Sequence, residues 1–175
     1  TSLAAVVPIA LAGAIGYAEQ GSVDINAAVA LLAGSVFGAL YGVKLLGQVP
    51  LKFLQFGFAT LLYFSAIRLI WSSNPHELLD GWASIALLIA VGFFAGVMAG
   101  LFGVGGGLVM VPALIITAGM NSIVARGTSL VVIVGSGLSG TWANFRKGNI
   151  DISYALLSGL AGIPSTFLGV YISHQ

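Results

Sequence analysis

The sequence predicts an all-α protein: a polytopic bundle of transmembrane helices with internal repeats and one broken, re-entrant helix. Three observations predict this class. Hydrophobic residues make up 58% of the 175 residues and charged residues only 6%, with a mean hydropathy of +1.07. The apolar residues form separate runs of membrane-spanning length, and a glycine cluster interrupts the longest run. A soluble domain of this size cannot bury so much apolar side chain, so lipid is the expected solvent for most of the surface.

The five unbroken apolar runs are each 18–24 residues long, which is the length that one transmembrane helix requires. Every charged residue lies either between these runs or within the first or last four residues of one. We therefore predict one membrane-spanning helix for each run: Thr1–Ala18, Val23–Leu46, Leu51–Trp71, Gly127–Phe145 and Ile150–Ser173.

The segment from Gly81 to Gly119 holds 39 consecutive uncharged residues. A straight helix of that length would measure about 58 Å, roughly twice the hydrocarbon thickness of a bilayer, so the segment must break. We predict a helix over Gly81–Phe102, unwound backbone over Val104–Gly107 and a short helix over Leu108–Ala118. Pro112 is expected in the first turns of that short helix, where a missing N–H is tolerated.

The predicted break contains three adjacent glycines, Gly105, Gly106 and Gly107. Helix starts expose N–H groups and a partial positive charge, so a break that opens into a helix can hold an anion. The alternative is a packing notch where another helix crosses. The glycine spacing fits neither the dinucleotide-binding pattern nor the P-loop, so a nucleotide site is not expected.

An internal repeat relates residues that lie 127 positions apart. Thr1-Ser2-Leu3 matches Thr128-Ser129-Leu130, and Asp24-Ile25 matches Asp151-Ile152. At this offset 13 of 48 overlapping positions are identical, where roughly 4–5 would coincide by chance, so duplication is the better explanation. The same offset places a first copy of the Gly81 unit about 46 residues before Thr1, and a final helix beyond Gln175, in a protein of about 244 residues.

The repeat predicts the domain organisation. Residues 1–71 form part of a first repeat with three transmembrane helices, residues 72–80 form an inter-repeat loop, and residues 81–175 form a second repeat whose final helix is missing. The second repeat consists of a broken helical hairpin and two transmembrane helices. If the segment 81–118 crosses the membrane once, the repeats are parallel; if it returns as a hairpin, they are inverted. The distribution of Lys and Arg favours inversion.

Several polar residues are candidates for substrate binding. Thr128-Ser129 and Thr1-Ser2 are expected at equivalent helix starts, where their hydroxyls either cap the helix or donate to a bound oxyanion. Arg126 either attracts anions at the entrance or is an ordinary interfacial arginine. Asn144, with Ser136, Ser139 and Thr141, either lines a cavity or bonds one helix to another.

Two glycine stripes with four-residue spacing predict close helix packing rather than chemistry: Gly34, Gly38 and Gly42, and Gly92, Gly96 and Gly100. The sequence has no cysteine, no metal-ligand spacing around its two histidines and no nucleophile–base pair. We therefore expect no cofactor, no metal and no enzymatic activity. A net charge of +1 without a basic run gives no indication of nucleic-acid binding.

Two stretches resemble a known family. GLFGVGGGLVMVPALI (residues 100–116) and ARGTSL (residues 125–130) are similar to the glycine-rich signature and the following segment of the sulfite exporter TauE/SafE family, also described as the four-toluene sulfonate uptake permease group. Thr1-Ser2-Leu3 resembles the first-half copy. The resemblance implies a multi-pass permease of the inner membrane with two related halves. By the same resemblance, the substrate residues are Gly105, Gly106, Gly107, Pro112, Thr128 and Ser129, with Thr1 and Ser2 by internal symmetry.

These observations lead us to expect a secondary transporter of small sulfur-containing anions, such as sulfite, thiosulfate or organosulfonates. The alternatives are an anion channel and a non-transporting membrane subunit that scaffolds a partner. The expected partners are a small anionic substrate and the lipid bilayer, with homodimerisation left open.

Overall fold

The computed structural model describes residues 1–46 and 82–173, together with the isolated positions 48, 50, 52, 56, 59, 60, 63 and 67. In these ranges the chain forms helices and no strand, which confirms the all-α class. The helices are α1 (Ser2–Glu19), α2 (Ile25–Leu45), α4 (Trp82–Phe102), α5 (Gly107–Thr117), α6 (Ser122–Arg146) and α7 (Ile152–Ser173). All of these except α5 are long and apolar enough to cross a membrane.

The helix bounds agree closely with the predicted spans, with one exception. Helices α1, α2 and α7 begin and end within two residues of the predictions. The exception is α6, which begins at Ser122, five residues before the predicted start, because the Asn121 side chain accepts a hydrogen bond from the Ile123 N–H and caps the helix there. The predicted span over residues 51–71 lies largely outside the described residues, and the predicted loop 72–80 lies wholly outside them.

The glycine-rich segment breaks as predicted. Helix α4 ends at Phe102, residues 103–106 are not helical, and α5 begins at Gly107, one residue before the predicted start. The expectation for Pro112 was wrong, because Pro112 is the sixth residue of α5 and lies beyond its first turn.

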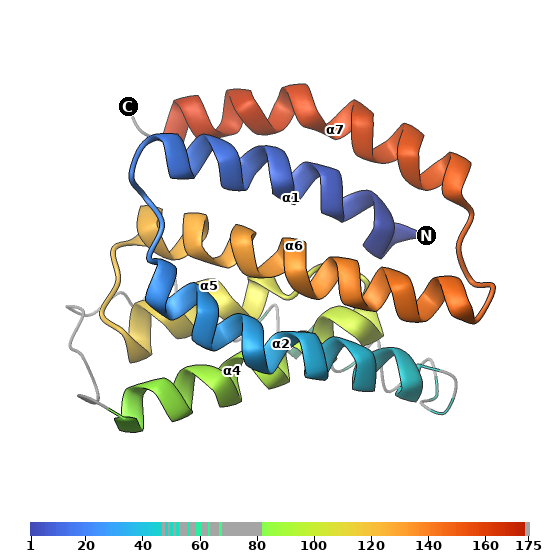
Figure 1. Ribbon diagram of the computed structural model, residues 1–175, viewed down its shortest axis with the longest axis horizontal. Helices are drawn as coiled ribbons and strands as arrows, with labels where there is room; N and C mark the ends of the chain where they lie inside the picture. The colour runs from blue at the N-terminus through green and yellow to red at the C-terminus, as the bar shows by residue number, and fades with distance from the viewer. Residues whose placement is uncertain are drawn as a thin grey trace.

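Helices α2 and α4 form the closest helix pair of the bundle. A Cβ atom added at Gly34 would overlap the backbone oxygen of Ile89, and one added at Gly42 would overlap that of Val97. The two glycine stripes therefore face each other, and small residues allow the backbones to touch, as the sequence predicts. Contacts advance in the same direction along both helices, so α2 and α4 are parallel, as Figure 1 shows.

The internal repeat is reflected in the helix packing, because equivalent helices pack on equivalent neighbours from the other repeat. Residues of α1 and α2 lie 127 positions before their counterparts in α6 and α7. Helix α1 packs on α7, and its counterpart α6 packs on α2, while α1 and α6 pack on each other at the centre. A pseudo-two-fold axis therefore runs through the contact between α1 and α6.

The repeats are inverted. Gly13 packs against Leu130, and the equivalent pair Gly140 and Leu3 packs in the same way, so the end of α1 lies beside the start of α6. Figure 1 shows that α1 and α6 run in opposite directions, as do α2 and α7. In the same view α5 turns back toward the end of the bundle where α4 begins, which makes the segment a hairpin.

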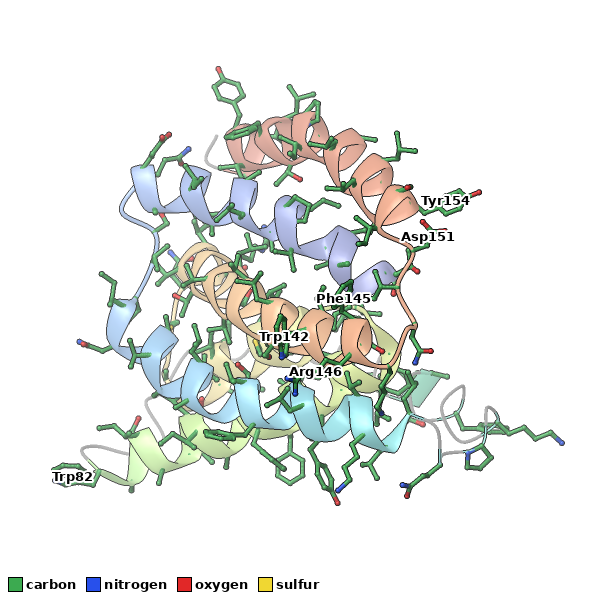
Figure 2. All side chains as sticks on the ribbon, turned by 45° about the vertical axis from the view of Figure 1, so that its right-hand side comes forward. Trp82, Trp142, Phe145, Arg146, Asp151 and Tyr154 are labelled. Carbon is green, nitrogen blue, oxygen red and sulfur yellow. The ribbon has the colours of Figure 1, made fainter. Side chains whose placement is uncertain are left out.

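Apolar and aromatic side chains cover the outside of the bundle. Trp82 is 89% exposed and Tyr154 is 67% exposed, and Figure 2 shows them at opposite ends of the bundle. Trp142 on α6 is also exposed, and the guanidinium carbon of Arg146 lies 5.4 Å from its ring centroid. Exposed aliphatic side chains between aromatic ends are typical of a surface that faces lipid, and the chain is a multi-pass membrane protein.

Candidate anion site at the helix break

The backbone of the break requires glycine. Gly103, Gly105 and Gly106 have φ angles of +72°, +85° and +75°, in the left-handed region that side chains with a Cβ rarely adopt. Gly106 is also the N-cap residue of α5, and an added Cβ there would lie 2.8 Å from the backbone oxygen of Ala95 on α4. The glycines thus provide both the turn and the close return of α5 onto α4.

The start of α5 lies deep in the bundle. A Cβ at Gly105 would be 2.9 Å from a methyl carbon of Ile133 and 3.1 Å from a methyl carbon of Val6. Ile133 lies near the middle of α6. Val6 and Ile133 are repeat counterparts, 127 positions apart. Gly105 therefore lies beside the pseudo-two-fold axis, between equivalent side chains from the two halves.

The break presents backbone donors. Within residues 82–173, the carbonyl oxygen of Gly106 accepts hydrogen bonds from Val109 and Met110, whereas the N–H groups of Gly105, Gly106 and Gly107 have no protein acceptor. Gly105 and Gly106 are buried. A buried N–H group without a partner is costly, and water or a ligand normally satisfies it. These three amides and the N-terminal dipole of α5 are suited to bind a small anion.

The hydroxyl groups of Thr1 and Ser2 lie at the start of α1. The Ser2 hydroxyl donates to the carbonyl oxygen of Gly103 over 3.3 Å, so it contacts the start of the break. The Thr1 hydroxyl oxygen accepts a hydrogen bond from the Asp151 N–H over 3.2 Å. Of the two, Ser2 is the residue that the structure brings to the break.

Thr128 and Ser129 do not cap a helix, contrary to one of the expectations. They are the seventh and eighth residues of α6, and both are buried. The Thr128 hydroxyl oxygen accepts from the Asp24 N–H over 2.9 Å, and the Ser129 hydroxyl donates to the Arg126 carbonyl over 2.8 Å. Ser129 lies one helical turn from Ile133, on the same face of α6.

Arg126 and Asn144 cannot share one small site. They are 18 residues apart on α6, which corresponds to about 27 Å along the helix. Arg126 is exposed, while Asn144 is buried and its side-chain amide donates to the Gly140 carbonyl of its own helix.

Three further polar residues of α6 were expected either to line a cavity or to bond one helix to another. The hydroxyls of Ser136 and Ser139 donate to carbonyls of their own helix. They therefore do not bond one helix to another, as one reading of the sequence supposed. The Thr141 hydroxyl oxygen is buried without a hydrogen-bond partner in the described part of the chain.

Sequence reasoning missed the apolar neighbours of the break and the two aspartates that bind the repeat threonines. Val6 and Ile133 carried no polar signal, although the repeat offset pairs them. Asp24 and Asp151 stand out only as a matched pair at that offset. The repeat was therefore the one signal that could have identified all four residues.

Comparison with known proteins shows the family of the chain. The family model described as "Sulfite exporter TauE/SafE" matches residues 87–175, which include the break and helices α5 to α7. The chain belongs to the sulfite exporter TauE/SafE family.

Relatives of this TauE/SafE chain carry transporter names. It is 34% identical over 97 residues to "Probable membrane transporter protein YunE" of Bacillus subtilis. That alignment covers 51% of the chain and 36% of the relative. It is 24% identical over 177 residues to "Probable membrane transporter protein YdhB" of the same organism, covering 98% of the chain and 71% of the relative. A "Probable membrane transporter protein" of Xylella fastidiosa is 28% identical over 99% of the chain and 68% of its own length. No solved structure matches the chain.

Proposed function

We propose that this chain forms the substrate pathway of a secondary transporter for small sulfur-containing anions, such as sulfite, thiosulfate or organosulfonates, in the inner membrane. One observation supports the proposal: at the start of α5, deep within the bundle, lie three amide donors that have no acceptor among the described residues. The sulfur chemistry of the substrate rests on the family description, and the anionic charge rests on the geometry.

The site suits an anion that must bind and then leave. Amide dipoles and a helix N-terminus supply partial positive charge, equivalent to roughly half an elementary charge, without a buried cation. A full positive charge next to the anion would bind it more tightly and slow its release. Sulfite and sulfonates each present three oxygens on one side of sulfur, so three N–H donors can each bind one oxygen.

The inverted repeats support alternating access. When two halves of opposite orientation pack around an axis in the membrane plane, exchanging their conformations opens the opposite side of the site. Gly105 lies beside that axis, between Val6 and Ile133, which come from different halves. A small movement of α1 against α6 would therefore change the access to the break from both sides of the membrane.

The donor role can be tested at Gly107, the first residue of α5. Gly107→Pro removes one N–H group at the first helical position, where the φ angle of proline suits a helix. Gly107→Ala is the matched control, because it retains the N–H and its Cβ would meet only the end of the Ile133 side chain. The measurement is uptake of radiolabelled sulfite by proteoliposomes that contain the full-length protein, together with sulfite binding in detergent.

We expect Gly107→Pro to lose sulfite binding and flux by about 10-fold or more, which is the effect of one hydrogen bond to a charged group. Gly107→Ala should remain within about 2-fold of the wild type, a change too small to represent a lost hydrogen bond. Equal behaviour of two folded variants would reject the site. Flux that does not saturate with sulfite concentration would indicate a channel instead of a carrier.

A further inference from the structure

Helix α7 exposes a stripe of small residues that has no partner in the described part of the bundle. Ala161, Ser165 and Gly169 follow one another at four-residue spacing, and all three are exposed. A Cβ atom added at Gly169 would meet no atom within 4 Å. Only 17% of an apolar stretch of 18 residues in α7 is buried, compared with 50% of the corresponding stretch in α2.

The counterparts of this stripe are covered completely. The residues 127 positions earlier are Gly34, Gly38 and Gly42 on α2. All three are buried, and added Cβ atoms would overlap backbone atoms of α4. Since α2 and α7 are equivalent helices, the structure shows what covers this face in one repeat and leaves the same face open in the other.

We propose that the α7 stripe, defined as Ala161, Ser165 and Gly169, is the docking surface for a transmembrane helix equivalent to α4. This helix belongs to the same polypeptide in the longer protein and precedes Thr1 in its first repeat. It is apolar and carries small residues at four-residue spacing, as α4 does with Gly92, Gly96 and Gly100.

The lengths of the relatives support this occupant. Alignments with YdhB and with the Xylella fastidiosa protein cover nearly the whole chain, but only 71% and 68% of those relatives. The relatives therefore have residues outside the matched region. The repeat offset places the counterpart of α4 before Thr1, which is where the missing half of the symmetric arrangement has to come from.

A second asymmetry points to the same place. Thr128 and Ser129 on α6 are buried. Helix α5 packs on α6 beside that buried pair, and α1 has no such neighbour among the described helices. A counterpart of the α4–α5 hairpin would thus give α1 that neighbour and cover the stripe on α7.

The packing will be less close than that of α2 on α4. Ala161 and Ser165 are larger than Gly34 and Gly38, so the backbones cannot approach to the same separation. Small side chains still let two helices pack closely in lipid, and the Ser165 hydroxyl is already satisfied by the Gly162 carbonyl at 2.8 Å. The face can therefore pack against an apolar helix without burying an unpaired hydroxyl.

Spin labelling of the full-length protein tests the proposal. The 175 residues contain no cysteine, so Ser165→Cys provides a label site in the stripe with little change in side-chain size. Leu160→Cys is the matched control, because Leu160 is 60% exposed and its counterpart Ala33 on α2 is also exposed. The measurement is the collision rate of each nitroxide with oxygen, which is high in lipid and low between packed helices, in membranes reconstituted after removal of any other cysteine.

We expect the label at Ser165 to collide with oxygen at least about 5-fold less often than the label at Leu160, since only the Leu160 site faces lipid. Equal collision rates at the two sites would overturn the proposal. A second measurement excludes another occupant: strong dipolar coupling or a disulfide between two copies of the Ser165→Cys variant would show that a second copy of the protein covers the stripe, and would also overturn it. Both measurements are independent of transport activity.

Discussion

The hydroxyl oxygen of Thr128 accepts a hydrogen bond from the backbone N–H of Asp24, with 2.9 Å between the two atoms. The repeat counterparts, Thr1 and Asp151, make the same bond at 3.2 Å. Each aspartate also accepts from an N–H group in the first turn of the helix that follows it, Asp24 from Ala27 and Asp151 from Ser153. Each repeat therefore anchors the start of a helix in the other repeat.

Thr128→Val should destabilise the protein by about 1–2 kcal/mol, because it leaves the partly buried Asp24 N–H without an acceptor. Thr128→Ser retains the hydroxyl and should cost less. Thermal unfolding in detergent measures both changes. If the valine variant were as stable as the serine variant, the hydrogen bond would contribute nothing to the stability of the protein.

Gly106→Ala should strongly reduce sulfite flux, because it forces a left-handed residue to carry a Cβ that would lie 2.8 Å from the Ala95 oxygen. Gly148→Ala is the matched control, with φ of +70° but no atom within 4 Å of the added carbon. The measurement is sulfite uptake by each variant, divided by the amount of protein that elutes as a single symmetric peak in size-exclusion chromatography. Similar losses in both would show that backbone strain alone, and not this position, impairs transport.

Gly42→Ala should destabilise the α2–α4 pair by about 1–3 kcal/mol, since the new methyl group would overlap the Val97 carbonyl and push the helices apart. Ala33→Leu adds more bulk to an exposed position of the same helix and should change stability little. Chemical unfolding followed by tryptophan fluorescence gives both values. A neutral Gly42→Ala result would contradict the close approach of the two backbones.

Residues Gln20 and Asn149 should be accessible from opposite sides of the membrane. Each is exposed, and each lies in the loop that joins equivalent helices of the two inverted repeats. A membrane-impermeant maleimide applied to intact cells should label only one of the variants Gln20→Cys and Asn149→Cys, and should label both after the membrane is opened. Labelling of both variants in intact cells would favour parallel repeats.

The sequence predicted the break within one residue because its cause is local. Three adjacent glycines weaken a helix wherever they occur, and an uncharged run of 39 residues is too long for one span. The repeat was equally visible, because Thr-Ser-Leu and Asp-Ile recur at one offset. Neither the break nor the repeat requires knowledge of which residues are in contact in the folded protein to be predicted.

The errors came from interactions between residues that are distant in the sequence or from local signals that were read too strongly. The charge of Arg126 favours a loop, and this shifts the predicted start of the helix past the Asn121 cap. The shifted start predicts a capping role for Thr128, although its hydrogen-bond partner is Asp24, 104 residues away. The placement of Val6 and Ile133 around Gly105 depends on how α1 crosses α6, which no local pattern encodes.

The pairing of Val6 and Ile133 on either side of Gly105 has an evolutionary consequence. Immediately after the duplication the two positions held the same residue, so both halves presented the same side chain to the centre, in opposite membrane orientation. After divergence, each could change alone, and the two approaches to the centre could acquire different shapes. Isoleucine is larger than valine by a single methylene group, so the two halves now differ by one carbon at these equivalent positions beside Gly105.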